Sequence, residues 1–378
     1  MLRGMELTWA DVRARRLARS HLSKPAPRTR LVEVVREVGG IHAQVMSAAE
    51  LALSARVRGL TQKHVSRALW EERSLVKTWT LRGTLHIHAA DELGLWLAAR
   101  RAVAGGWYFH HEVPPKEQKQ ILDAIAGALD GRCLRRDELV AAVSPHVGPW
   151  AREHIGSGWG TVLGPAALNG LLIHGPPQGS RVTFVRPDQW LGKPVGQDPQ
   201  AALAEVLRRY LAAFGPAAPG HFATWIGGTH FKVKDSKALL DSIADELVEV
   251  EVEGKPAWLL AERERKPAAP AGVRLIPEYD ALVMGFRERE QLFSPRAVAR
   301  TKAHGKGRLE GPGALSWLLA DGVVAGTWSR KRAGKHVELR VEPFRLLTKV
   351  ERSELDAEAE RVGRLWSLEP ALSVAPAT

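Results

Sequence analysis

The pattern that decides the fold lies in residues 60–88, LTQKHVSRALWEERSLVKTWTLRGTLHIH. Thr61 is a suitable N-cap residue, and Val65 and Leu69 follow it at the spacing of the buried face of a helix. Two segments rich in β-branched and aromatic residues then flank Arg82-Gly83, which predicts two strands joined by a tight turn. Residues 60–88 therefore predict a helix followed by a β-hairpin.

Another helix is predicted before this stretch. Residues 30–40, RLVEVVREVGG, repeat apolar side chains at helical spacing and end in Gly39 and Gly40, a typical stop signal for a helix. The order helix, helix, hairpin is typical of a winged-helix module.

The same order recurs further along the chain. Short helices are predicted at residues 137–143 and 164–173. A hairpin follows, with the turn GPPQGS at residues 175–180 and the strand RVTFVR after it.

A third set of these elements is the clearest. Helices are predicted at residues 199–214 and 235–246, the second with Asp235 as its N-cap. Residues 247–260 then predict a hairpin that turns at Glu253-Gly254. Three such sets predict tandem winged-helix modules.

The remaining residues belong to a different structural class. A charged, Pro- and Ala-rich linker is predicted at residues 261–272. Strand-like segments follow at residues 273–285, 316–330 and 336–344. A hairpin turn is predicted at Asp321-Gly322 and a basic hairpin tip at residues 330–335. We expect an amphipathic helix at 352–368 to close the fold, and the final SVAPAT to fray.

These patterns predict an α+β protein of tandem winged-helix modules with a β-rich C-terminal part. The expected division is residues 1–105 for a first module with a candidate catalytic loop, 106–196 for a second module, 197–262 for a third, and 263–378 for the β-rich domain with its closing helix.

Composition points to a polyanionic partner. Of 378 residues, 54 are Lys or Arg and 42 are Asp or Glu, which gives a net charge of +12. Nucleic acid is the first candidate partner, provided that the excess charge gathers on one face. An anionic membrane surface also fits the basicity, but no stretch approaches the roughly 18 apolar residues of a membrane span. The lone Cys133 excludes an intramolecular disulfide and a Cys-rich zinc site, so we expect a cytoplasmic protein.

The first candidate for chemistry is the loop after residues 30–40. If this loop is extended, His42 and Gln44 project to the same side and can address one ligand together. Residue types alone favour a structural interpretation, in which Gln44 caps the next helix and His42 is a partly buried loop residue.

A second candidate lies in the first hairpin. His86 and His88 share a strand face, but no Cys or acidic residue before Asp91 completes a metal-ligand set, so we expect no metal there. Arg82, at the turn, can reach a phosphate, although a solvated arginine would look the same in the sequence.

Basic segments supply the remaining candidates. Residues 296–308 form a Gly-containing basic stretch, and the hairpin tip at 330–335 is another, a pattern that fits either a solvated surface or a groove that follows phosphates. The candidate DNA contacts are Arg82, Arg300, Lys302, Arg330, Lys331, Arg332 and Lys335. No P-loop, H-E-x-x-H or G-x-S-x-G motif is present, so nucleotide hydrolysis and zincin chemistry have no support.

Several longer motifs carry a resemblance to a known family. They are GGIHAQ at residues 39–44, TWTLRGTLHIH at 78–88, GHFATWIGG at 220–228, LIPEYDALVMG at 275–285 and LLADGVVAGTW at 318–328. Together, over about residues 8–368 and in the family's order, they resemble the winged-helix DNA glycosylases typified by AlkZ and YcaQ.

The resemblance implies a C-shaped arrangement of winged-helix modules around duplex DNA and hydrolysis of the N-glycosidic bond of alkylated purines. The family's catalytic Gln-x-Gln or Gln-x-Asp motif aligns with residues 42–44, where His42 replaces the first Gln and Gln44 is retained. This His-x-Gln form resembles a branch associated with self-resistance to DNA-alkylating natural products, which implies bulky N7-guanine adducts or interstrand crosslinks as substrates.

The chemistry is compatible with so small a motif, because an N7-alkylated purine carries positive charge and is already a good leaving group. A neutral imidazole accepts a proton from water near pH 7, and an amide carbonyl orients that water. The loop contains no lysine that could form a Schiff base, so we expect a monofunctional enzyme. We also expect it to use no cofactor, to be a monomer, and to act in the cytoplasm at the nucleoid.

The main alternative is a non-catalytic winged-helix transcriptional regulator that reads an operator. Composition and charge fit such a DNA-binding protein equally well. The two differ in one property, because a regulator releases no base from DNA.

Overall fold

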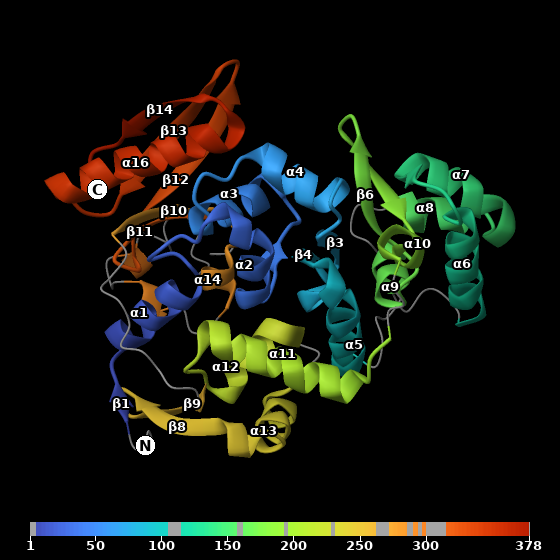
Figure 1. Cartoon of the computed structure of the whole chain (residues 1–378), viewed down its shortest axis with the longest axis horizontal. Helices are drawn as coiled ribbons and strands as arrows, with labels where there is room; N and C mark the ends of the chain where they lie inside the picture. The colour runs from blue at the N-terminus through green and yellow to red at the C-terminus, as the bar shows by residue number, and fades with distance from the viewer. Residues whose placement is uncertain are drawn as a thin grey trace. The chain divides into compact units, whose positions relative to one another are not determined.

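A computed structural model describes residues 5–104, 115–156, 162–192, 196–227, 231–261, 272–285, 290–293, 297–299 and 315–377 (Figure 1). Helices and strands both occur throughout, which confirms the α+β class. The chain forms two units. The first comprises Met1–Val65, Leu207–Trp225 and Lys232–Thr378, and the second comprises Ser66–Val206 and Ile226–Phe231. The predicted linker at 261–272 lies almost entirely outside the described residues.

The first unit opens with the helices that carry the candidate catalytic loop. They are α1 (Trp9–Arg19), α2 (Leu31–Glu37) and α3 (Met46–Arg56), with the short strand β2 (Ile41–His42) between the last two. Gly39 and Gly40 have φ of 75° and 96°, the left-handed backbone that ends a helix, so the predicted glycine stop is confirmed. The helix α3 was not predicted, because residues 48–56 are buried on all sides and show no polar face.

A five-stranded sheet forms the C-terminal part of this unit. Its strand order is β10 (Val273–Ile276), β11 (Ser316–Ala320), β12 (Val323–Ala333), β13 (His336–Pro343) and β14 (Glu369–Val374). Neighbouring strands are antiparallel except β13 and β14, which are parallel. The helix α16 (Lys349–Trp366) lies along the sheet (Figure 1), and Leu355 and Val362 pack in one core with Val273 and Leu339.

Two expectations for this part were wrong. The strand predicted at 273–285 ends at Ile276, because the Asp280 carboxylate accepts a hydrogen bond from the Leu282 amide and caps the short helix α14 (Ala281–Met284). The last residues do not all fray, since Ser373 and Val374 pair with β13 and the Ala375 amide donates to the Val341 carbonyl.

The rest of the first unit contains most of the third predicted set. It includes the second half of the helix α11 (Pro199–Phe214), most of α12 (Pro219–Gly227), the helix α13 (Val233–Asp241), and the strands β1 (Glu6–Leu7), β8 (Leu247–Val252) and β9 (Lys255–Leu260). The predicted bounds of α11 and the turn at Glu253-Gly254 are confirmed. Asp235 is not the N-cap of α13. It is the third helical residue and accepts a hydrogen bond from the amide of the N-cap residue, Lys232.

The second unit is built from helices and two β-hairpins, with the short strand β5 paired to one of them. Its elements are α4 (Gln62–Trp70), β3 (Leu75–Trp79), β4 (Leu85–Ala89), α5 (Leu93–Ala104), α6 (Pro115–Ala128), β5 (Leu134–Arg135), α7 (Arg136–Val147), α8 (Trp150–Gly156), α9 (Leu163–Leu168), β6 (Ile173–Gln178), β7 (Arg181–Val185) and α10 (Pro187–Leu191). The helix and hairpin predicted from residues 60–88 are confirmed, with β3 and β4 antiparallel around a turn at Leu81–Gly83. The turn predicted at 175–180 is shorter, because β6 continues to Gln178.

Candidate active site

The candidate catalytic loop connects β2 to α3. His42 ends β2 with only 9% of its surface exposed, whereas Gln44 is exposed in the bend that follows. The N-cap residue of α3 is Val45, so Gln44 does not occupy the capping position that the structural interpretation gave it. The loop thus presents one buried imidazole and one exposed amide, two residues apart.

The imidazole of His42 lies against the ring of Tyr279. The two ring centroids are 4.7 Å apart and the planes differ by 30°, which is a stacked arrangement. Tyr279 belongs to the segment between β10 and α14 and is half-buried. Its φ is 60°, a left-handed backbone conformation that bulky residues rarely adopt.

Glu278, directly before Tyr279, is held by an arginine of β12. The two terminal nitrogens of Arg330 donate to the two carboxylate oxygens of Glu278 at 2.8 Å each, and the Ser316 hydroxyl donates at 2.8 Å. Burial acts to raise the pKa of Glu278, but the hydrogen bonds and charge of Arg330 outweigh it and lower the pKa below its ordinary value. Glu278 is therefore ionised at neutral pH.

Asp280, directly after Tyr279, is held in the same way by an arginine of α3. Arg56 donates from its two terminal nitrogens to the carboxylate oxygens of Asp280 at 2.8 and 2.7 Å. Neither side chain is exposed. Loss of either partner of such a buried bidentate pair leaves the other charge buried without its counter-ion, which is strongly destabilising.

The helix α3 is also fixed against α16. The Trp366 indole donates to Glu50 at 2.9 Å, and Arg361 donates to the Ser54 hydroxyl at 2.6 Å. Arg332 of β12 lies over the Trp366 ring at 3.9 Å and 3.8 Å from Glu50. The loop that carries His42 and Gln44 therefore leads into a helix that is firmly held.

The candidate DNA contacts on the β12–β13 hairpin fall into two groups. Lys331, Arg332 and Lys335 are exposed, and the chain turns at Gly334 with φ of 60°. Arg330 does not lie at the tip, because β12 continues to Ala333, and its side chain is only 14% exposed beside Glu278.

The other candidate DNA contacts lie elsewhere. Arg82 is half-buried in the turn between β3 and β4, with φ of 53°. Arg300 and Lys302 lie outside the described residues.

The histidines of β4 make contacts within the second unit. The Nε2 atom of His88 lies 2.8 Å from the Thr80 hydroxyl, and its ring stacks on Trp96. The Nδ1 atom of His86 lies 3.0 Å from the Thr84 carbonyl oxygen. Within the part of the chain that the structure describes, no group of three or more His, Cys, Asp or Glu residues is suited to hold a metal.

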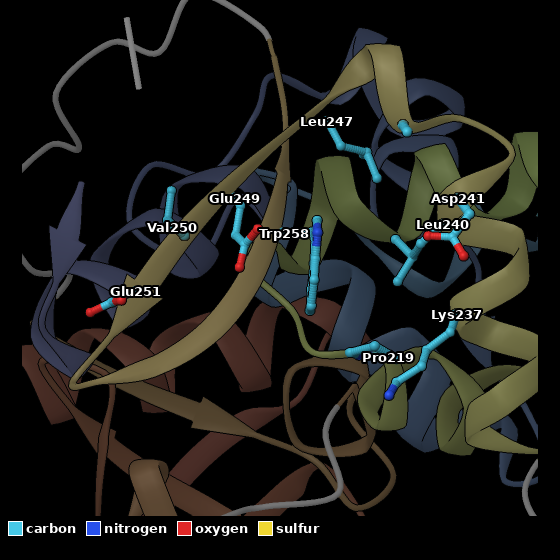
Figure 2. Close-up of a pocket in the computed structure, with 10 residues that line it drawn as sticks. Pro219, Lys237, Leu240, Asp241, Leu247, Glu249, Val250, Glu251 and Trp258 are labelled. Carbon is cyan, nitrogen blue, oxygen red and sulfur yellow. The ribbon is translucent and has the colours of Figure 1, made fainter. Parts of the chain in front are cut away.

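A separate pocket of about 740 Å³ lies between α13 and the β8–β9 hairpin. Figure 2 shows the Trp258 side chain standing in it, with Glu249 close by and Lys237 and Asp241 on the α13 side. His42 and Gln44 do not line this pocket. Three carboxylates among its lining residues, Asp241, Glu249 and Glu251, make it unsuited to DNA phosphates.

Reasoning from residue types did not single out Glu278, Tyr279, Asp280 or Arg56 as parts of the site. The first three lie within the family motif at 275–285 and had no role assigned, and Arg56 belongs to the helix that was not predicted. The signal available in the sequence was the alternation of acid, aromatic and acid in Glu278-Tyr279-Asp280.

Comparisons with known proteins identify the family to which the chain belongs. The family model of AlkZ-like DNA glycosylases matches residues 35–365. The "Interstrand DNA cross-link repair glycosylase" of Streptomyces sahachiroi is 32% identical, over 95% of this chain and 97% of its own length. The solved structure of the Streptomyces sahachiroi DNA glycosylase AlkZ matches with a TM-score of 0.83 at 30% identity, and covers 98% of this chain and all of that one.

These findings define the chain as a hydrolase that acts on DNA, and specifically as a DNA repair glycosylase. It belongs to the family of AlkZ-like DNA glycosylases. The expected family resemblance is confirmed, and the alternative of a transcriptional regulator has no support. No helix in the described ranges is both long and apolar enough to cross a bilayer.

Proposed function

We propose that this DNA glycosylase removes bulky N7-alkylated guanines or unhooks interstrand crosslinks in double-stranded DNA. The name of the relative from Streptomyces sahachiroi, an interstrand crosslink repair glycosylase similar over nearly the whole chain, supports this substrate class. The His-x-Gln motif adds the self-resistance role implied by the family branch that it resembles. The enzyme acts as a monomer in the cytoplasm, at the nucleoid.

The scaffold for this activity is a set of tandem winged-helix modules in a C shape around the duplex, divided at about residues 105, 196 and 262. The helix and hairpin at residues 62–89 and the hairpin at 247–260 support the modular interpretation. An open surface suits adducts that span both strands, since these cannot enter the snug pocket that a flipped base requires.

The observation that carries the mechanism is the pairing of a buried His42 with an exposed Gln44 in one loop. His42 acts as general base and Gln44 orients the attacking water. The water oxygen bonds to C1′ of the sugar while the bond from C1′ to purine N9 breaks. The electron pair of that bond neutralises the cationic purine, and His42 accepts the proton of the water. An abasic site and a free alkylpurine are the products.

DNA binding in this proposal rests on the exposed basic residues of the β12–β13 hairpin, Lys331, Arg332 and Lys335, together with Arg82, Arg300 and Lys302. Contacts of this type bind phosphates and carry no sequence information. Arg330 differs, because its guanidinium is held by Glu278, and we assign it to positioning instead.

The substrate class is tested by base release from matched duplexes. Duplexes with N7-methylguanine, with a bulky N7-guanine adduct or with an N7-linked interstrand crosslink are incubated with enzyme, and released bases are resolved by chromatography. We expect faster release of the bulky adduct than of N7-methylguanine. Release of N7-methylguanine alone would contradict the proposed substrate class, and release of no base would contradict glycosylase action on these lesions.

Monofunctional hydrolysis is tested on the same duplexes. The product should be an abasic site that breaks only after heat or alkali, because the catalytic loop offers no amine for a Schiff base. Borohydride present during turnover should trap no protein–DNA adduct. A covalent adduct would mean that a lysine elsewhere in the chain acts as nucleophile.

A further inference from the structure

The stacking of Tyr279 on His42 joins residues far apart in the sequence. It exists only because the segment between β10 and α14 lies beside the catalytic loop. The ring centroids are 4.7 Å apart, so the face of the tyrosine ring covers one face of the imidazole. The contribution of Tyr279 to the site is therefore made by its ring.

The backbone at Tyr279 is strained. A φ of 60° is unfavourable for a bulky aromatic residue, and such strain persists only where the surroundings dictate it. Core packing does not account for the conformation, since the residue remains half-buried.

The neighbours of Tyr279 supply the constraint. Arg330 donates two hydrogen bonds to Glu278, and Arg56 donates two to Asp280, with donor–acceptor distances of 2.7 to 2.8 Å. With both flanking carboxylates fixed, the residue between them has little freedom to relax. We call this arrangement of Glu278, Asp280, Arg330 and Arg56 the double clamp.

The double clamp is tied to the helix that follows the catalytic loop. Arg56 belongs to the last turn of α3, and Arg330 also donates to the Ser47 hydroxyl in its first turn, at 3.4 Å. The same helix thus begins beside Gln44 and helps to hold Tyr279. These contacts hold the segment with Tyr279 against the helix that follows the catalytic loop, so the Tyr279 ring and the His42 imidazole are fixed relative to each other.

We propose that Tyr279 is a positioning residue for His42, and that the double clamp holds its ring in place against the imidazole. The proposal rests on the proposed function, in which His42 is the general base. A base acts efficiently only when its ring nitrogen meets the proton that it accepts, so a fixed imidazole plane is an advantage that can offset strain elsewhere.

Two substitutions at Tyr279 separate the ring from the backbone. Tyr279→Gly removes the ring and relieves the strain, because glycine adopts positive φ freely, so folding should be preserved. Tyr279→Phe keeps the ring and removes only the hydroxyl. In single-turnover excision at saturating enzyme, Tyr279→Gly should lose roughly 2- to 10-fold in rate, in line with the usual contribution of an aromatic pair, and Tyr279→Phe should match wild type.

A spectroscopic measurement reads the stacking without reference to catalysis. The His42 ring protons, observed by NMR in specifically labelled enzyme, should carry a ring-current shift in wild type and Tyr279→Phe and lose it in Tyr279→Gly. Thermal melting checks that all three proteins are folded. Unchanged His42 resonances and an unchanged excision rate in folded Tyr279→Gly would overturn the proposal.

A His42→Ala background separates failure of this inference from failure of the proposed function. If Tyr279 acts through His42, Tyr279→Gly should cause no further loss of rate once His42 is absent. An additional loss of the same size would mean that Tyr279 acts independently, which contradicts positioning. Wild-type activity in His42→Ala itself would instead contradict His42 as base, whatever Tyr279 does.

Discussion

Arg330 and Glu278 form a bidentate ion pair, with both donor–acceptor distances at 2.8 Å. Glu278 directly precedes Tyr279, the residue whose ring stacks on His42. An arginine expected from its sequence context to face DNA is thus turned toward the protein. The pair links β12, which continues into the exposed basic hairpin, to the segment that supports the candidate active site. It separates Arg330, which holds the segment at Glu278, from the exposed Lys331 and Lys335, which are suited to bind phosphate.

This division predicts different defects for two variants. Arg330→Met removes the partner of Glu278, so single-turnover excision should fall by roughly 2- to 10-fold at most, the range expected for loss of the Tyr279 ring, while the salt dependence of DNA binding stays unchanged. Lys331→Ala combined with Lys335→Ala should make the negative slope of log K against log salt shallower by about 1.8, since each phosphate that is no longer neutralised reduces its magnitude by about 0.9. Binding titrations at several salt concentrations measure the slopes. A shallower salt dependence of DNA binding in Arg330→Met would mean that Arg330 contacts a DNA phosphate.

The buried pair between Arg56 and Asp280 predicts a large effect on stability. Asp280→Ala leaves a buried guanidinium without its carboxylate, removes the cap of α14, and should lower the free energy of unfolding by about 3 to 5 kcal/mol. Asp123→Ala is the control, because it breaks the exposed pair of Asp123 with Lys119 and should cost about 0 to 1 kcal/mol. Urea denaturation compares the two. Equal losses would show that the buried pair does not fix the segment around Tyr279.

The start of α16 predicts an acid-dependent contribution to stability. Hydrogen bonds from Arg345 lower the pKa of Glu351 from 4.5 to about 2. Burial acts in the opposite direction, and hydrogen bonds from Thr348 contribute to the lowering. Because the pKa is lower in the folded state, the stabilisation is complete above pH 4.5 and is lost as pH falls toward 2. Glu351→Gln should therefore be less stable than wild type at pH 7, with the difference vanishing near pH 2. Denaturation curves at several pH values test this, and a difference independent of pH would contradict it.

The elements that sequence reasoning found are those with a one-sided pattern. The helix α11 was predicted with its observed bounds because Leu203, Val206 and Tyr210 form a single buried stripe, and the β8–β9 hairpin because Glu253-Gly254 is a strong turn signal. The helix α3 was not predicted because its residues 48–56 are all buried, so its sequence shows no alternation of apolar and polar faces.

The candidate site was predictable only in part. The loop with His42 and Gln44 was found, because its motif lies within six consecutive residues. Tyr279 stacks on His42, and Arg330, expected to contact DNA, instead pairs with Glu278. Both contacts join segments that are far apart in the sequence. Local patterns carry no information on such contacts, and the strand-like appearance of residues 273–285 concealed the strained turn at Tyr279.

The central claim is that His42 acts as the general base on the attacking water. The most direct test is the single-turnover rate of excision of a bulky N7-guanine adduct, measured across pH for wild type, His42→Ala and His42→Gln. His42→Ala should lose about 100- to 10,000-fold while still binding DNA. The wild-type rate should fall at acidic pH, since only the neutral imidazole accepts a proton, and His42→Gln should lack this dependence. Wild-type rates in both variants, or the same fall with pH in His42→Gln, would contradict the claim.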